Sequence, residues 1–333
     1  MRDAKDEGQS VAADRPSGIT ALPDRIERYG NAKAQGVRFA SYLETFDAGS
    51  FNPFKLRVAS KLQSCGSYLL FRHWIDYDEV RLHAAYFCKQ HLVCPFCAIR
   101  RGSKMLEAYH ERYAVLRQAQ PELVPFLVTF TVKDGESLGE RYLHLRSAWR
   151  ALCKRRQGTR QATEWAKALG GVASFEVKRG RGSGLWHPHL HCVAMVDQAH
   201  PIDRVALAAE WLQLTGDSHI LDVRPIDIDN PVGGFAEVFK YALKFSDMAP
   251  ADTWAAFRLL RGSRLVEPFG CFRGVQADQG GLDAPLDGRY VEMLYRFVGT
   301  GYAFRGEVSQ GVELGQVRAR PAALGSGGAQ PPG

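Results

Sequence analysis

Apolar residues recur with regular periods through the middle of the chain and predict its secondary structure. Runs of β-branched and aromatic residues predict strands at 124–132, 172–177, 186–196 and 218–226. Apolar residues spaced three and four apart predict helices at 105–116, 138–156, 202–214 and 235–245. The first six elements from residue 124 follow a βαββαβ order. This order predicts an α+β fold with helices on one face of a central antiparallel sheet.

The two ends of the chain lack this periodicity. Residues 1–30 are polar and predict a disordered arm, and residues 319–333 predict a disordered tail. Between them we expect a cysteine-containing helical region, the domain that carries the sheet and a C-terminal extension, at 31–120, 121–275 and 276–318.

Three histidines occupy alternate positions of the strand predicted at 186–196. Side chains at such positions project from one face, so His187, His189 and His191 should point the same way and Cys192 should face the core. Imidazoles gathered on a rigid face favour a metal site, although polar residues on a half-exposed strand give the same pattern. Either Glu176, on the preceding strand, or His187 would be the third ligand.

Four cysteines precede the predicted sheet and suggest a second metal site. Cys94 and Cys97 form a Cys-x-x-Cys pair, with Cys88 and Cys65 upstream. Structural zinc requires four nitrogen or sulfur ligands, which these four thiols would supply. A nearby histidine could replace Cys65, and a set of reduced buried cysteines is the alternative to zinc.

Charge suggests an anionic partner. The 333 residues carry a net charge of +7, and basic residues cluster at 100–104, 154–156, 178–181 and 258–264. Nucleic acid is the commonest partner of such chains, although solubility alone also explains the charge. The candidate DNA contacts are Arg100, Arg101, Lys104, Arg179, Arg181 and Trp186. Seven cysteines and no visible export signal or membrane span indicate a reducing, cytoplasmic location.

The last predicted helix places Glu237, Tyr241 and Lys244 on one stripe. Tyrosine can act as a covalent nucleophile when a cation or base activates it, because its free pKa is near 10. The stripe alone fits an ordinary solvent-exposed face equally well.

Together these motifs resemble the HUH endonucleases, and more closely the plasmid rolling-circle replication initiators with one catalytic tyrosine. The resemblance runs from about Cys65 to Arg273. It rests on the residues 126–132, Trp186-His187-Pro188-His189-Leu190-His191, Tyr241-x-x-Lys244 with Glu237 four residues earlier, Cys94-Pro95-Phe96-Cys97, 260–264 and 270–273.

The resemblance implies that Tyr241 attacks a DNA phosphodiester at a plasmid origin and becomes joined to the 5′ phosphate, which frees a 3′ hydroxyl primer. It also implies a divalent ion on His189, His191 and Glu176, a role for Lys244 near the phosphate, and Glu237 in termination. Ligand softness favours manganese at least equally with magnesium. Expected partners are the origin DNA, a host helicase and the replication machinery.

The alternatives are a single-tyrosine transposase or relaxase, a zinc-stabilised DNA-binding protein without catalysis, and a metal-dependent hydrolase that uses water.

Overall fold

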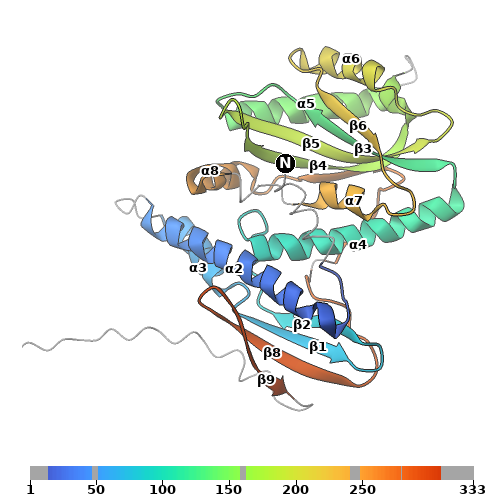
Figure 1. The fold of residues 1–333 in the computed structure, drawn as a ribbon. Coiled ribbons are helices and arrows are strands. Elements are labelled where there is room, and N and C mark those ends of the chain that lie inside the picture. The colour runs from blue at the N-terminus through green and yellow to red at the C-terminus, as the bar shows by residue number, and fades with distance from the viewer. Residues whose placement is uncertain (1–13, 47–51, 158–162, 241–247, 279, 309–333) are drawn as a thin grey trace, which may run out of the picture.

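The strands in the described part of the chain form two antiparallel sheets (Figure 1). The computed structural model describes residues 14–46, 52–157, 163–240, 248–278 and 280–308. The first sheet has the order β2-β1-β8-β9 and is built from β1 (Tyr68–Trp74), β2 (Glu79–Ala85), β8 (Tyr290–Val298) and β9 (Gly301–Val308). The second has the order β6-β3-β5-β4-β7 and is built from β3 (Leu123–Thr131), β4 (Ala168–Arg179), β5 (Trp186–Asp197), β6 (Leu221–Pro225) and β7 (Val266–Gly270).

Helices cover the first sheet and separate it from the second (Figure 1). The helical elements of the described residues are η1 (Ile19–Ala21), α2 (Leu22–Thr45), α3 (Pro53–Ser64), α4 (Pro95–Ala119), α5 (Leu138–Arg156), η2 (Glu164–Lys167), α6 (Arg204–Thr215), α7 (Val232–Phe239) and α8 (Pro250–Leu260). Apolar residues of α2 pack on β1, where the rings of Tyr29 and Phe71 stack with centroids 6.4 Å apart. Residues 22–30, expected to belong to a disordered arm, therefore form part of a packed helix.

The second sheet contains the predicted βαββαβ order as β3-α5-β4-β5-α6-β6. Alternate side chains of its central strands pack against α5 and α6, and Cys192 is buried on this face as predicted. The opposite side chains, such as Val193 and Met195, pack against α4 and α7. The expectation of helices on one face was therefore wrong, because α4 and α7 add an apolar layer below the sheet.

Local sequence signals explain how these elements are delimited. The side chain of Ser137 accepts a hydrogen bond from the backbone N–H of Glu140 and so caps the first turn of α5. Gly184, in the turn between β4 and β5, has a φ of +66°, a left-handed conformation that glycine adopts without strain. This turn sets the register that pairs Glu176 with His189 across the two strands.

The helix predicted at 235–245 is shorter than expected. Helix α7 ends at Phe239, and Lys240 already has an extended backbone conformation. Tyr241 and Lys244 lie outside the described residues. Glu237 is therefore the one member of the predicted stripe that the structure describes.

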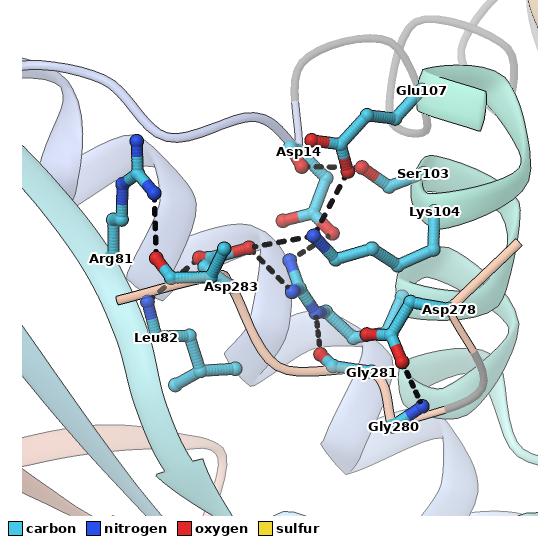
Figure 2. Close-up of polar contacts among 12 residues, drawn as sticks. Asp14, Arg81, Leu82, Ser103, Lys104, Glu107, Asp278, Gly280, Gly281 and Asp283 are labelled. Atoms are coloured by element: carbon cyan, nitrogen blue, oxygen red, sulfur yellow. Dashed lines mark hydrogen bonds and ion pairs between the residues drawn. The ribbon is translucent and has the colours of Figure 1, made fainter. Parts of the chain in front are cut away.

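A buried group of ion pairs joins α2 and α4 to the first sheet. Guanidinium nitrogens of Arg100 lie 2.9 Å from Asp14 and 2.7 Å from Asp283. Arg25 of α2 pairs with the same two carboxylates at 3.3 and 2.8 Å. Figure 2 shows Asp283 between Leu82 of β2 and Lys104 of α4. The carboxylate of Asp283 accepts a hydrogen bond from the backbone N–H of Leu82 at 2.7 Å.

Replacing Arg100 with methionine leaves Asp14 and Asp283 without one of their two shared arginines in a buried site. We expect Arg100→Met to lower the free energy of unfolding by about 3–5 kcal/mol, the usual effect of breaking a buried ion pair. Urea denaturation followed by circular dichroism measures it. Arg289→Met removes an arginine whose pair with Asp76 is exposed, and should leave the midpoint unchanged. Equal midpoints for Arg100→Met and the unaltered protein would contradict this role.

Candidate active site

Two histidines and a glutamate converge on the face of the second sheet that α4 and α7 cover. Glu176 of β4 is paired in register with His189 of β5, and its neighbour on that face, His191, lies two residues further along. The carboxylate oxygens of Glu176 lie 3.3 Å from Nε2 of His189 and 3.3 Å from Nε2 of His191. Candidate ligand atoms of all three lie within 4.8 Å of one another.

Electrostatics keeps Glu176 and His189 in the protonation states that bind metal. Glu176 is 2% exposed; burial alone would raise the pKa of its carboxyl, but His189, His191 and Lys240 together hold that pKa well below its usual range. Burial lowers the pKa of His189 to about 3, although the charge of Glu176 opposes the shift. The carboxylate is therefore charged and the imidazole of His189 neutral near pH 7, as metal ligands must be.

The geometry of the three side chains fits a divalent ion. Nitrogen and oxygen ligands bind such ions at about 2.0–2.2 Å, which places neighbouring ligand atoms about 3 Å apart. Nε2 of His191 is buried and faces Glu176, with no other polar partner among the described residues, so both groups are available to a shared ligand. Its other ring nitrogen lies 3.0 Å from the hydroxyl of Thr129, a contact that orients the imidazole.

His187 lies outside this cluster. Its Nδ1 contacts the carboxylate of Asp134 at 2.5 Å, and the group of candidate ligands contains Glu176 instead. The two alternatives for the third ligand are thus separated in space, and Glu176 is the one whose oxygens face both imidazoles.

Lys240 enters the cluster from the end of α7 and was missed in the sequence. Its ammonium lies 3.5 Å from a Glu176 oxygen and also pairs with Glu237 of the same helix. Only 7% of Lys240 is exposed. The three-residue spacing of Glu237 and Lys240 could have indicated this pair. Tyr241, the predicted nucleophile, follows Lys240 directly in the sequence.

The four predicted cysteines form a second cluster at the start of α4. Sγ of Cys65 lies 3.4 Å from that of Cys97 and 3.5 Å from that of Cys94, and Cys88 lies 3.6 Å from Cys97. A tetrahedral zinc with bonds of about 2.3 Å separates its sulfur ligands by about 3.8 Å, so these buried thiols fit the ion. Cys65 completes the group, and neither nearby histidine belongs to it.

The predicted DNA contacts at the start of α4 divide into two kinds. Arg100 is 1% exposed within the ion-pair group described above. Lys104 is also buried, and its ammonium lies 2.9 Å from Glu107 and 3.7 Å from Asp283. Both side chains are therefore engaged inside the protein, contrary to the exposed positions expected of DNA contacts. Arg101 is half-buried and lines a cavity of about 30 Å³ together with His91, Ser174 and Lys240.

The predicted DNA contacts around the turn between β4 and β5 also differ from one another in exposure. Arg179 forms two hydrogen bonds with Asp252 of α8, at 2.6 and 3.0 Å, and its guanidinium lies 3.8 Å from the ring centre of Trp186. Trp186, expected as a DNA contact, is 5% exposed, so its ring offers little surface to DNA. Arg181 is exposed in the turn.

Sequence comparison identifies the family. A family model described as "Replication protein" matches residues 79–281, more than half of the 333-residue chain. The chain therefore belongs to the replication protein family, as its resemblance to rolling-circle initiators indicated. The matched region includes both the histidine–glutamate cluster and three of the four clustered cysteines.

Three curated relatives are each named "Protein rep". One from a Bacillus species is 27% identical over 202 residues, which cover 60% of this chain and 63% of the relative. One from Lactiplantibacillus plantarum is 24% identical over 242 residues, or 68% and 72% of the two chains. One from Streptococcus pneumoniae serotype 2 is 26% identical over 204 residues, or 57% and 61%. No solved structure matches the chain.

Among the described residues, no helix combines the length and the apolar character needed to cross a membrane.

Bound zinc should be required for the stability of the region that contains the four cysteines. We expect Cys94→Ser to lose bound zinc and to unfold at lower temperature, because metal binding at such sites contributes directly to folding. Elemental analysis and thermal denaturation under reducing conditions measure both effects. Cys271→Ser changes a cysteine outside the cluster and should keep the zinc. A zinc-free but equally stable native protein would exclude a structural zinc.

Glu176→Gln should weaken metal binding while preserving the shape of the side chain. Because the change removes the one negative ligand of the cluster, we expect the affinity for Mn²⁺ to fall at least roughly 10–100-fold. Calorimetric titration of Mn²⁺ measures this. His187→Gln, adjacent to but outside the cluster, should bind Mn²⁺ with nearly unchanged affinity. Equal losses for the two variants would contradict the proposed ligand set.

Proposed function

We propose that the protein initiates rolling-circle replication of a plasmid by nicking one strand of the origin. Membership of the replication protein family supports a role in initiation. The observation that carries the nicking mechanism is the cluster of Glu176, His189 and His191, which lies against Lys240, the residue directly before Tyr241.

In this proposal the nucleophile is Tyr241. Its hydroxyl oxygen forms a bond to the phosphorus of the scissile phosphodiester as the bond from phosphorus to the 3′ oxygen breaks. The phenolic proton leaves, and the departing 3′ oxygen takes up a proton. One phosphoester bond replaces another, so the energy of the bond is retained and the strand can later be rejoined. The free 3′ hydroxyl serves as the primer for synthesis.

Glu176, His189 and His191 would hold a divalent ion, manganese or magnesium. When bound, such an ion polarises the scissile phosphate and offsets the charge that develops in the transition state. The protein's own contribution is to present two buried ligands, Glu176 and His189, and the half-buried His191 from two paired strands, which restrains their geometry. With two imidazole ligands, activity with manganese is expected to equal or exceed that with magnesium.

Lys240 and Glu237 are proposed to act beside the nucleophile. The ammonium of Lys240 is paired with both Glu176 and Glu237, so it supplies positive charge where a phosphate or phenolate would lie. Glu237, the more exposed of the two carboxylates, is proposed to activate water or a second hydroxyl for the cleavage that ends a round of replication. For Lys244 we propose the role that the family resemblance implies, a positive charge near the phosphate.

The strand to be nicked is proposed to approach along α4. Arg101 has no ion-pair or hydrogen-bond partner among the described residues, and its cavity extends to Ser174 and Lys240. A guanidinium in this position suits a phosphate next to the scissile one. Arg181, exposed in the turn between β4 and β5, is a second candidate contact. A host helicase and the replication machinery are the further partners proposed.

The nicking mechanism predicts a covalent adduct that depends on one hydroxyl group. Single-stranded oligonucleotides that tile the DNA around the gene, incubated with Mn²⁺, should yield a protein–DNA adduct on a denaturing gel, and peptide mass spectrometry should map it to Tyr241. Tyr241→Phe should form no adduct, since it lacks the attacking oxygen. Tyr295→Phe, in the first sheet, is the matched control and should react normally.

Other outcomes would favour the alternatives. Cleaved DNA without an adduct would indicate a hydrolase that uses water. Binding without cleavage on every oligonucleotide and with every metal would indicate a DNA-binding protein without nuclease activity.

A further inference from the structure

An open groove lies between α5 and the end of α8, on the side of the second sheet opposite the histidine–glutamate cluster. It has a volume of about 550 Å³. The lining from α5 includes Tyr142, Leu143, Arg146 and Arg150, and the lining from α8 and the loop after it includes Leu259 and Arg264. The ring of Tyr142 contacts Phe175, whose side chain faces α5, which places the groove on this side of the sheet.

The side chains that line the groove are basic, apolar or uncharged, and none of them is acidic. Arg146, Arg150 and Arg264 are its charged members, and Glu140 adjoins the lining in the first turn of α5. Arg146 is engaged by Glu267 at 3.1 Å, and Glu267 also accepts a hydrogen bond from the indole of Trp149 at 3.2 Å. One of the three lining arginines is therefore neutralised by an acid.

Two arginines of the groove lining are exposed and lack partners. Arg150 and Arg264 form no ion pair or hydrogen bond with any residue that the structure describes, and the same holds for Arg258, an exposed residue of α8 outside the lining. Arg150 and Arg264 line opposite sides of the groove, and Arg258 lies on α8 next to Leu259. Like charges concentrated without counter-ions repel one another and favour the binding of a polyanion.

The lining favours double-stranded over single-stranded DNA. Sites for single strands stack bases on exposed aromatic side chains. The one aromatic residue of this lining, Tyr142, is buried and its hydroxyl accepts a hydrogen bond from Arg146 at 3.0 Å. Arginines on both walls of an open groove instead suit contacts to the phosphate backbone, which do not depend on base sequence.

We infer that this groove binds the backbone of duplex DNA beside the nick site. The inference rests on the proposed function and adds a second surface to it. Because the groove and the histidine–glutamate cluster lie on opposite sides of one sheet, duplex in the groove leaves the cluster open to the strand that is nicked. The protein thus contacts the origin at two separate places through one rigid element.

The test is the double variant Arg150→Gln/Arg264→Gln, with Arg38→Gln/Arg204→Gln as a control that removes the same charge from exposed positions elsewhere. Fluorescence anisotropy measures binding to a labelled duplex that contains the origin and to an oligodeoxythymidylate, over a series of salt concentrations. In the absence of DNA, thermal denaturation should give the same midpoint for the unaltered protein and both double variants, since the altered side chains are exposed.

We expect the groove variant to bind duplex roughly tenfold more weakly, and the slope of its log affinity against log salt to shrink by about 1.8 for two lost phosphate contacts. Binding to the oligodeoxythymidylate and adduct formation on short single strands should be unchanged. Duplex affinity and slope equal to those of the control variant would overturn the inference. An equal loss of single-strand binding would also overturn it, in favour of a single-strand site.

These readouts separate the inference from the proposed function. If the unaltered protein forms no adduct on any oligonucleotide, the nicking mechanism fails, yet the duplex measurement still decides whether the groove binds DNA. If the adduct forms normally and the double variant binds duplex with unchanged affinity, the nicking mechanism stands and the assignment of the groove fails.

Discussion

The structure of the candidate site depends on the burial of one charged carboxylate. Removing a carboxylate from water is strongly unfavourable unless cations and polar hydrogens replace the lost solvation. Glu176 meets this requirement through His189 and His191 on the next strand and Lys240 from α7, at 3.3–3.5 Å. The strand register, the end of α7 and the layer contributed by α4 must therefore all form together for the site to exist.

Local periodicity was enough to predict much of the second sheet. Helix α5 has the predicted limits, 138–156, because a serine cap and a long apolar stripe mark it clearly. The first sheet could not be predicted in this way. Its β1 pairs with β8, as in the contact between Arg72 and Glu292, across more than half of the chain, and local patterns carry no information on such pairs. Residues 14–30 were assigned to a disordered arm because Asp14 and Arg25 look polar, yet they are buried as partners of one another.

The site was predictable where chemistry and strand period agreed. Alternation placed His189 and His191 on one face, and the Cys-x-x-Cys pair located the thiol cluster. The cations were harder, because sequence alone does not reveal which arginine is paired. Arg100 and Arg101 are neighbours on α4, but one is enclosed by two carboxylates and the other lines a cavity. Lys240 was overlooked because the expected helix continued to residue 245, whereas α7 ends at Phe239.

The interleaved first sheet has a consequence for how the protein is made. Strands β1 and β2 precede the second sheet in the chain, and β8 and β9 follow it. During translation every strand of the second sheet emerges while β1 still exposes an edge with unsatisfied backbone groups, which is a template for intermolecular pairing. A premature stop codon between Gly270 and Tyr290 would yield a polypeptide that contains the whole candidate site and also the unpaired edge of β1. The edge of β1 is therefore covered only after β8 has been made, so an early-terminated chain stays prone to aggregation.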